Sequence, residues 1–116
     1  AAEDALLKEK TFTETATASL PGVFYVFDEN GKYLRWNENF ERVTGYAPDE
    51  IRRIHPLDLF PPADQPLIEQ RIGEVLTSGE GAVAEDFLSK DRTLTPYFFT
   101  GSRVVMDRKL CVVALG

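Results

Sequence analysis

The sequence predicts an α+β domain built on one antiparallel sheet with its helices on one face. Two strand-like segments come first, helical segments occupy the middle, and three strand-like segments end the chain. Because strands and helices are segregated along the chain instead of alternating, an antiparallel sheet is expected. At 116 residues, 43% of them apolar, the chain is long enough for one domain with its own core.

The first predicted element pair is a β-hairpin over residues 23–36. Residues 23–27 form a β-branched and aromatic run, which favours a buried strand. Asn30 and Gly31 both tolerate the positive φ angles of a type I′ turn, and residues 33–36 continue with strand-like side chains. This hairpin is expected to form the start of the sheet.

Two short helices are predicted after the hairpin. Asn37 is expected to cap the first, which Gly45 ends, with Phe40 and Val43 pointing inward. The second begins at residues 47–50, where proline lies in the first turn and acidic residues lie at the positive helix end. The proline-rich residues 55–62 that follow have room for about one irregular turn.

The clearest helix is predicted from Asp64, as its cap, to Gly79. Its apolar residues recur at the spacing of one helix face: Ile68, Ile72, Val75 and Leu76. This stripe is expected to lie on the sheet. Polar turns then separate the last three predicted strands, over residues 81–88, 94–105 and 109–116.

Residues 1–19 are predicted to form an amphipathic helix ahead of the domain proper, which covers residues 20–116. Leu6, Leu7 and Phe12 recur at roughly helical spacing. Outside the core these side chains would expose apolar surface, so we expect this segment to support a homodimer. Because the sequence begins without methionine and ends in an apolar strand, we interpret it as part of a longer protein.

The composition excludes several classes of function. The net charge is −6 and no basic run is present, which disfavours binding to nucleic acid or to an anionic membrane. The sequence has no apolar stretch of roughly 18 residues, so no insertion into a membrane is expected. The single cysteine cannot form an internal disulfide, and this favours a reducing, cytoplasmic compartment.

Several of these features, taken in order, resemble a PAS domain, the small sensory module of signalling proteins. The resemblance rests on the turn at residues 28–31, Trp36-Asn37, Phe40 with residues 44–46, residues 48–50, and residues 56–61 with Asp64. It implies a five-stranded sheet in the order 2-1-5-4-3, with helices forming a pocket over one face. It also implies sensing of a small molecule or a partner, relay through the flanking helices to an effector domain of a parent histidine kinase or diguanylate cyclase, and no catalysis.

The resemblance leaves a cofactor-bearing sensor as one alternative. His55 is the only histidine, and an imidazole can ligate haem, but haem-binding members of the family carry their ligand on the long helix, where residues 67–77 contain no histidine. Cys111 lies in an apolar strand, outside the position of the reactive cysteine of flavin-binding members. We therefore expect no haem, flavin or metal, and no catalytic residues.

Strand alternation and the family register together predict the pocket. If Tyr25 and Phe27 face the helices, period two turns Phe24 and Val26 to the other face. In the last strand, the family register implies that Ala114 and Gly116 also face the helices, where their small size leaves space. The predicted lining is Tyr25, Phe27, Trp36, Phe40, Thr44, Ile54, Phe60, Ile72, Leu76, Phe99, Ala114 and Gly116. We expect a small, largely uncharged or aromatic ligand. The alternative is that these side chains fill the core, which would leave a ligand-free dimerisation or protein-interaction module.

Overall fold

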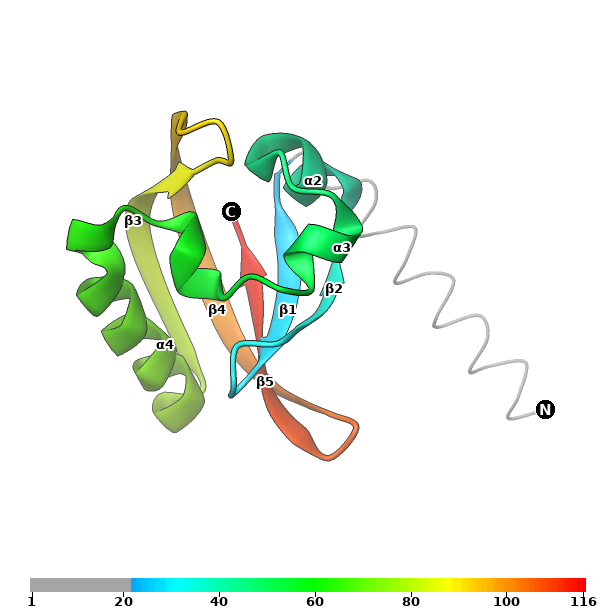
Figure 1. Cartoon of the computed structure of the whole chain (residues 1–116). Helices are drawn as coiled ribbons and strands as arrows, with labels where there is room; N and C mark the ends of the chain where they lie inside the picture. The colour runs from blue at the N-terminus through cyan, green and yellow to red at the C-terminus, as the bar shows by residue number, and fades with distance from the viewer. Residues whose placement is uncertain (1–21) are drawn as a thin grey trace.

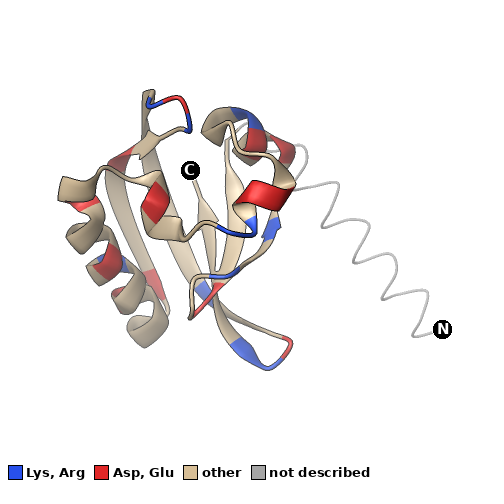
Figure 2. Cartoon of the chain, in the orientation of Figure 1, with Lys and Arg blue, Asp and Glu red and all other residues tan. Residues whose placement is uncertain are grey.

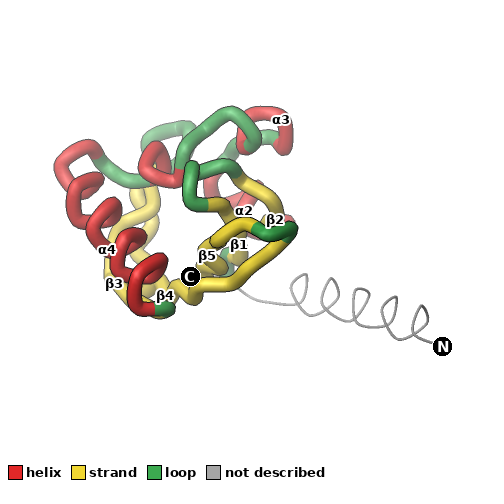
Figure 3. Tube along the Cα trace, turned by 90° about the horizontal axis from the view of Figure 1, so that it is seen from below, coloured by secondary structure: helices red, strands yellow, loops and turns green. Residues whose placement is uncertain are grey.

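Residues 22–116 are described by the computed structural model, and the predicted helix over residues 1–19 lies outside them. A single five-stranded antiparallel sheet runs in the order β2-β1-β5-β4-β3, as the resemblance implied. Its strands are β1 (Phe24–Asp28), β2 (Tyr33–Trp36), β3 (Glu80–Leu88), β4 (Leu94–Met106) and β5 (Lys109–Leu115). The helical elements between β2 and β3 pack against one face (Figures 1 and 3).

The helical elements follow the predicted order. They are α2 (Glu38–Thr44), α3 (Pro48–Ile51), two 3-10 turns at Pro56–Leu59 and Pro62–Asp64, and the long helix α4 (Gln65–Ser78). Gly45 and Gly79 end α2 and α4 with φ angles of 76° and 102°, a left-handed conformation that glycine adopts without strain.

The first hairpin does not close with the predicted type I′ turn. Of Asn30 and Gly31, only Gly31 has a positive φ angle, at 84°. The reason is Asp28, whose Oδ1 accepts hydrogen bonds from the backbone N–H groups of Asn30 and Lys32, both at 2.9 Å. This side chain imposes its own turn on the loop, and the pairing register shifts between Val26 and Phe27.

The type I′ signature occurs instead in the last hairpin. Met106 pairs with Lys109, and the two residues between them, Asp107 and Arg108, have φ angles of 52° and 65°. A two-residue loop between twisted strands favours this conformation even without glycine. The strain at Arg108 is therefore imposed by the register of β4 and β5.

Asn37 caps α2 as predicted and also fastens the helix to the sheet. Its Oδ1 accepts from the backbone N–H of Phe40 at 3.0 Å and from that of Phe24, at the start of β1, at 3.1 Å. Its Nδ2 donates to the carbonyl oxygen of Gly22 at 3.0 Å. One buried side chain thus fixes the angle between the first strand and the first described helix.

Asp64 does not cap α4 through its side chain, contrary to the prediction. It ends the preceding 3-10 turn with φ −96° and ψ −11°, and its carboxylate makes no capping hydrogen bond. Because the 3-10 turn runs directly into α4, Asp64 is already in a helical conformation, whereas a capping residue needs an extended one.

The packing of α4 on the sheet depends on two glycines that pair across β3 and β4. Gly81 lies opposite Gly101. A Cβ atom at either position would lie 2.9 Å or 3.2 Å from a methyl group of Val75, which is closer than ordinary contact. The absence of side chains here lets the helix approach the strands, and it defines one end of the space between them.

The core is largely aromatic and lies on the helix-bearing face. The Phe40 and Phe87 side chains are 0% and 2% exposed, and the ring of Tyr25 lies 4.8 Å from that of Phe40. Charged residues concentrate on the helices and turns, and the middles of β1 and β5 carry none (Figure 2). Within residues 22–116, no helix combines the length and apolar composition needed to cross a bilayer.

Candidate functional site

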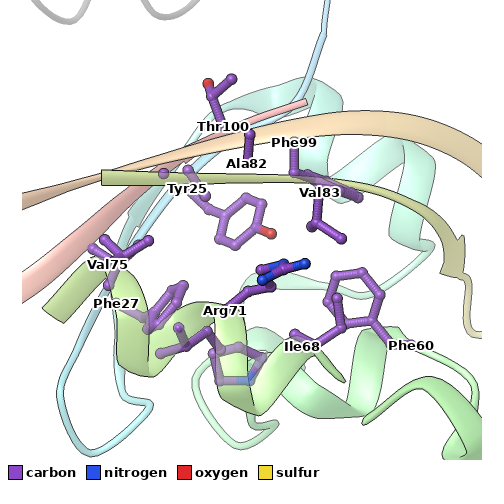
Figure 4. A pocket seen from close by; sticks show the side chains of 16 residues that line it. Tyr25, Phe27, Phe60, Ile68, Arg71, Val75, Ala82, Val83, Phe99 and Thr100 are labelled. Atoms are coloured by element: carbon purple, nitrogen blue, oxygen red, sulfur yellow. The ribbon is translucent and has the colours of Figure 1, made fainter. Parts of the chain in front are cut away.

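A cavity of about 60 Å³ lies between α4 and the sheet. Its walls come from β1, the crossover at Pro56 and Phe60, the inner face of α4, and facing stretches of β3, β4 and β5. Figure 4 shows side chains of α4 and of the strands converging on this space from opposite sides. Ordinary pockets for drug-sized ligands are several times larger, so the space inside this cavity favours a very small molecule.

Half of the predicted pocket residues line this cavity. They are Tyr25, Phe27, Phe60, Ile72, Phe99 and Ala114. Alternation along β1 and β5 accounts for three of them, because Tyr25 lies directly opposite Ala114 in the pairing of the two strands. Whether they bind a ligand stays a prediction.

The other predicted residues lie elsewhere: Trp36, Phe40, Thr44, Ile54, Leu76 and Gly116. Trp36 turns toward α2, where its Nε1 donates to the Glu41 carboxylate at 2.8 Å. The Thr44 hydroxyl donates to the backbone oxygen of Phe40 at 2.6 Å, which completes the end of the helix. Phe40 itself is fully buried beside Tyr25. The side chains of Trp36, Phe40 and Thr44 therefore stabilise α2 and its packing on the sheet.

The space expected at Gly116 is occupied by its neighbours. A Cβ atom there would lie 2.7 Å from the ring of Phe99 and 2.9 Å from a methyl group of Val23. Ile54 and Leu76 are half-buried and pack at the margin of the core. The small residue at the end of β5 therefore admits an aromatic ring of this chain, and the open space lies nearer Ala114.

The predicted lining did not include ten of the sixteen residues around the cavity, and Arg71 is the charged one among them. It lies on α4 three positions after Ile68 and four before Val75, so it shares their inward face. A single arginine in an amphipathic helix is usually solvated, and the apolar spacing was read without it. Among the described residues that line the cavity, Arg71 is the only one with a charge.

The guanidinium of Arg71 is only partly satisfied. Its Nη1 donates to both carboxylate oxygens of Glu74, at 3.0 Å each. Its Nε is buried and has no hydrogen-bond acceptor among residues 22–116. In Figure 4 this guanidinium lies in the space between α4 and the strands. A buried donor without an acceptor is unusual in a folded protein and calls for an explanation.

Two buried tyrosines add hydroxyl groups to this side of the sheet. Burial raises the pKa of Tyr25 above its usual range, and burial together with the nearby Tyr25 and Asp58 raises that of Tyr33. Both hydroxyls therefore stay protonated and can donate hydrogen bonds at any physiological pH. The Tyr33 hydroxyl is buried without a partner in the described part of the chain.

His55 and Cys111 do not line the cavity, and each has a role in the fold. The Nδ1 of His55 accepts from the backbone N–H of Leu57 at 3.1 Å, and Asp58 accepts from the His55 N–H at 2.8 Å, so the pair caps a 3-10 turn. Cys111 is buried in β5, where burial raises the pKa of its thiol. Residues 22–116 contain no group of three or more histidine, cysteine or acidic side chains placed to hold a metal ion.

Fold and cavity together define a class of protein: small α+β domains in which one antiparallel sheet and the helices on one of its faces leave a small cavity between them. The comparison with protein families gives the family. Residues 17–114 match the family described as PAS fold, and the chain belongs to that family. A search of curated proteins finds no match.

Solved PAS domains share the fold at low sequence identity. The PAS domain of an HTR-like protein from Haloarcula marismortui is 14% identical, with a TM-score of 0.80 over 98% of this chain and 94% of that one. A domain of a sensor histidine kinase/response regulator from Geobacter sulfurreducens is 14% identical, with a TM-score of 0.78 over 94% and 95%. PAS-B of Drosophila melanogaster Cycle, with bound ethylene glycol, is 15% identical, with a TM-score of 0.69 over 79% and 94%.

Proposed function

We propose that this chain is a cytoplasmic sensory PAS domain of a larger signalling protein, of histidine kinase or diguanylate cyclase type, and that it binds a small molecule in the cavity below α4. The observation that carries the proposal is the cavity itself, which α4, the crossover and four strands enclose. The presence of ethylene glycol in the Cycle PAS-B structure supports a ligand of this very small size. The sensor histidine kinase of Geobacter sulfurreducens supports the type of parent protein.

The signal would be a shift between two positions of α4. Its inner face borders the cavity, and its last turn is fastened to β4 because Arg103 donates to the backbone oxygens of Leu76 and Thr77 at 3.1 and 3.3 Å. A ligand that favours one position of α4 would therefore move β4 and the strands beside it. A ligand shifts the equilibrium between the two positions of α4 only by the difference in its affinity for them. The effector must therefore respond to the change in their populations.

Replacing Ala114 with leucine should fill the cavity. Ala114 is 6% exposed and lines the cavity from β5, so the larger side chain should abolish ligand binding while overpacking costs about 1–3 kcal/mol of stability. The measurement is a thermal-shift screen of small molecules against both proteins. Ala84→Leu on the exposed side of β3 is the matched control. If Ala114→Leu folds and gives the same hits as the parent chain, the cavity is not the sensing site.

Native mass spectrometry together with an absorption spectrum distinguishes the proposal from its alternatives. A bound small mass without colour supports the small-molecule sensor. A Soret or flavin band supports a cofactor-bearing sensor. A protein that carries neither and gives no thermal-shift hits supports an interaction module.

A homodimerisation module is the second candidate, because the other face of the sheet exposes apolar side chains. Phe98 and Leu115 are 64% and 40% exposed on the face opposite Phe99 and Ala114. An exposed apolar surface of this kind is typical of an interaction site. We propose that residues 1–19 and this face contribute to a homodimer, which would also bring two effector domains together.

Deletion of residues 1–19 should lower the sedimentation mass from that of a dimer to that of a monomer. The reason is that Leu6, Leu7 and Phe12 supply the apolar side of the predicted helix. Sedimentation velocity at high micromolar concentration makes the comparison. The dimer proposal is wrong if the full chain already sediments as a monomer under these conditions.

A further inference from the structure

Arg71 brings a charge and an unused donor into a cavity whose other walls are almost entirely apolar. A guanidinium carries five N–H donors in a planar fork. Glu74 accepts only from Nη1, so the edge of the fork that contains Nε has no acceptor within the described residues. Because a buried donor without a partner is destabilising, the free domain holds Arg71 in a conformation that an added acceptor would stabilise.

The geometry of that edge matches one chemical group well. Two neighbouring N–H donors of a guanidinium fit the two oxygens of a carboxylate, and such charge-assisted pairs are among the strongest hydrogen-bonded contacts in proteins. We propose that the cavity below α4 binds a short-chain monocarboxylate, with its carboxylate on Arg71 and its alkyl tail against the apolar walls. This inference rests on the proposed function and specifies the ligand class of the same site.

The size and polarity of the cavity restrict the ligand further. A cavity of about 60 Å³ holds roughly four or five water-sized groups, since each needs on the order of 10–15 Å³ by this measure. An aromatic ring needs more room, because an engineered apolar cavity that binds benzene measures about 150 Å³. The cavity therefore favours a ligand of a few atoms over the aromatic ligand predicted from the sequence.

The walls also favour a single charge and an apolar tail. Most lining side chains, such as Phe27, Ile68 and Val75, offer no hydrogen-bond donors, and besides Arg71 only the hydroxyls of Tyr25 and Thr100 can donate among the described lining residues. A phosphate, a sulfate or a dicarboxylate would bring further charge into a cavity in which Arg71 is the only charged residue among the described lining residues. Burying charge without a partner is unfavourable. Acetate, propionate and similar acids add a single negative charge beside a guanidinium that Glu74 contacts only through Nη1.

Glu74 provides a second test, because its variant should change carboxylate affinity in the direction opposite to that of an Arg71 variant. Its carboxylate contacts Nη1 of the same guanidinium and competes with a second carboxylate through its charge, with the two side chains 38% and 43% exposed. Removing Arg71 removes the anchor, whereas removing the charge of Glu74 removes the competitor and leaves the anchor in place. Variants at these two positions of one helix should therefore change carboxylate affinity in opposite directions.

The experiment is an NMR titration of the whole 116-residue chain with sodium propionate, read from backbone amide signals and the Nε–Hε signal of Arg71. Propionamide is the uncharged ligand of the same shape. Propionate should shift the Arg71 signal and the amides of residues 81–83 and 99–101 saturably, and propionamide should bind at least tenfold more weakly. Arg71→Gln should weaken propionate binding at least tenfold, and Glu74→Gln should tighten it several-fold.

Arg42→Gln is the matched control, because Arg42 on α2 forms a comparable ion pair with Glu38 at 3.3 Å and does not line the cavity. It should leave the affinity for propionate unchanged. If Arg71→Gln does not fold, Arg71→Lys keeps the charge without the planar fork and should still weaken binding at least several-fold.

Three results would overturn the carboxylate assignment. The first is equal affinity for propionate and propionamide, and the second is unchanged propionate affinity in the Arg71 variant. The third is binding of a neutral molecule such as ethylene glycol to the same amides without any binding of propionate. In each of these cases a small-molecule site remains, so the proposed sensory function survives. If no small molecule perturbs the cavity amides at all, both the assignment and the small-molecule sensor are wrong.

Discussion

Phe87→Ala is expected to lower the free energy of unfolding by about 3–5 kcal/mol, the range for removing a fully buried phenylalanine from a packed core. Phe87 lies on β3 and is 2% exposed. Its ring centroid lies 4.9 to 6.1 Å from those of five other aromatic residues: Tyr25, Phe40, Phe60, Tyr97 and Phe99. No local collapse can fill the space it leaves, because its neighbours are anchored on different elements.

Urea unfolding followed by tryptophan fluorescence measures this effect, with Trp36 as the natural probe. Phe98→Ala is the control, since Phe98 is on the neighbouring strand β4 and is 64% exposed. Its removal should change stability by no more than about 0.5 kcal/mol. Similar losses for the two variants would show that Phe87 does not organise the core.

The parts of the fold that could be predicted from the sequence are those that short-range chemistry determines. Asn37 and Gly45 mark the two ends of α2 because a cap needs a side-chain acceptor and a left-handed residue, whatever lies around the helix. The spacing of Ile68 and Val75 gave the buried face of α4 for the same reason, since helix geometry alone places them together. The order of the strands came from the family resemblance, because no local pattern states which strands are neighbours.

The turns show where the residues of a loop did not suffice to predict its backbone conformation. Asn30-Gly31 is a strong type I′ pattern, yet the carboxylate of Asp28 competes for the loop N–H groups and produces a different turn. Asp107-Arg108 is a weak pattern, yet the two-residue loop between β4 and β5 requires positive φ angles at both positions. In the last hairpin the requirements of the sheet outweighed residue preference.

The site could be predicted only where a periodic pattern or the family register gives the direction of a side chain. Alternation along β1 identified Tyr25 and Phe27, helix spacing along α4 identified Ile72, and the family register identified Ala114. The position of the Phe99 ring against Gly116 is a contact between different strands, and no periodic pattern contains it. Arg71 was missed because an arginine on an amphipathic helix is usually solvated, so the inward face of α4 was identified from its apolar residues alone.

Asn37→Ala should be the next most damaging single change, with an expected loss of about 2–4 kcal/mol in the free energy of unfolding. Asn37 is 6% exposed, and its side chain serves the backbone groups of Gly22, Phe24 and Phe40. Losing an N-cap costs about 0.5–2 kcal/mol, and leaving the backbone N–H of Phe24 without its side-chain acceptor adds about 1–3 kcal/mol, whereas the Gly22 oxygen keeps the Nδ2 donor of Asn39 at 3.2 Å. The loss should therefore exceed that of an ordinary helix cap.

Asn37→Asp separates the two contributions, because a carboxylate can still accept from Phe24 and Phe40 but cannot donate to Gly22. Its stability should fall between those of the parent chain and Asn37→Ala. Hydrogen exchange provides the local measurement: the amide of Phe24 should lose protection in Asn37→Ala and retain most of it in Asn37→Asp. Asn30→Ala, at an exposed asparagine in the first hairpin, is the control and should change stability by no more than about 0.5 kcal/mol. If Asn37→Ala costs under 1 kcal/mol and Phe24 stays protected, the sheet holds β1 and α2 together without this side chain, and another contact sets the angle between them.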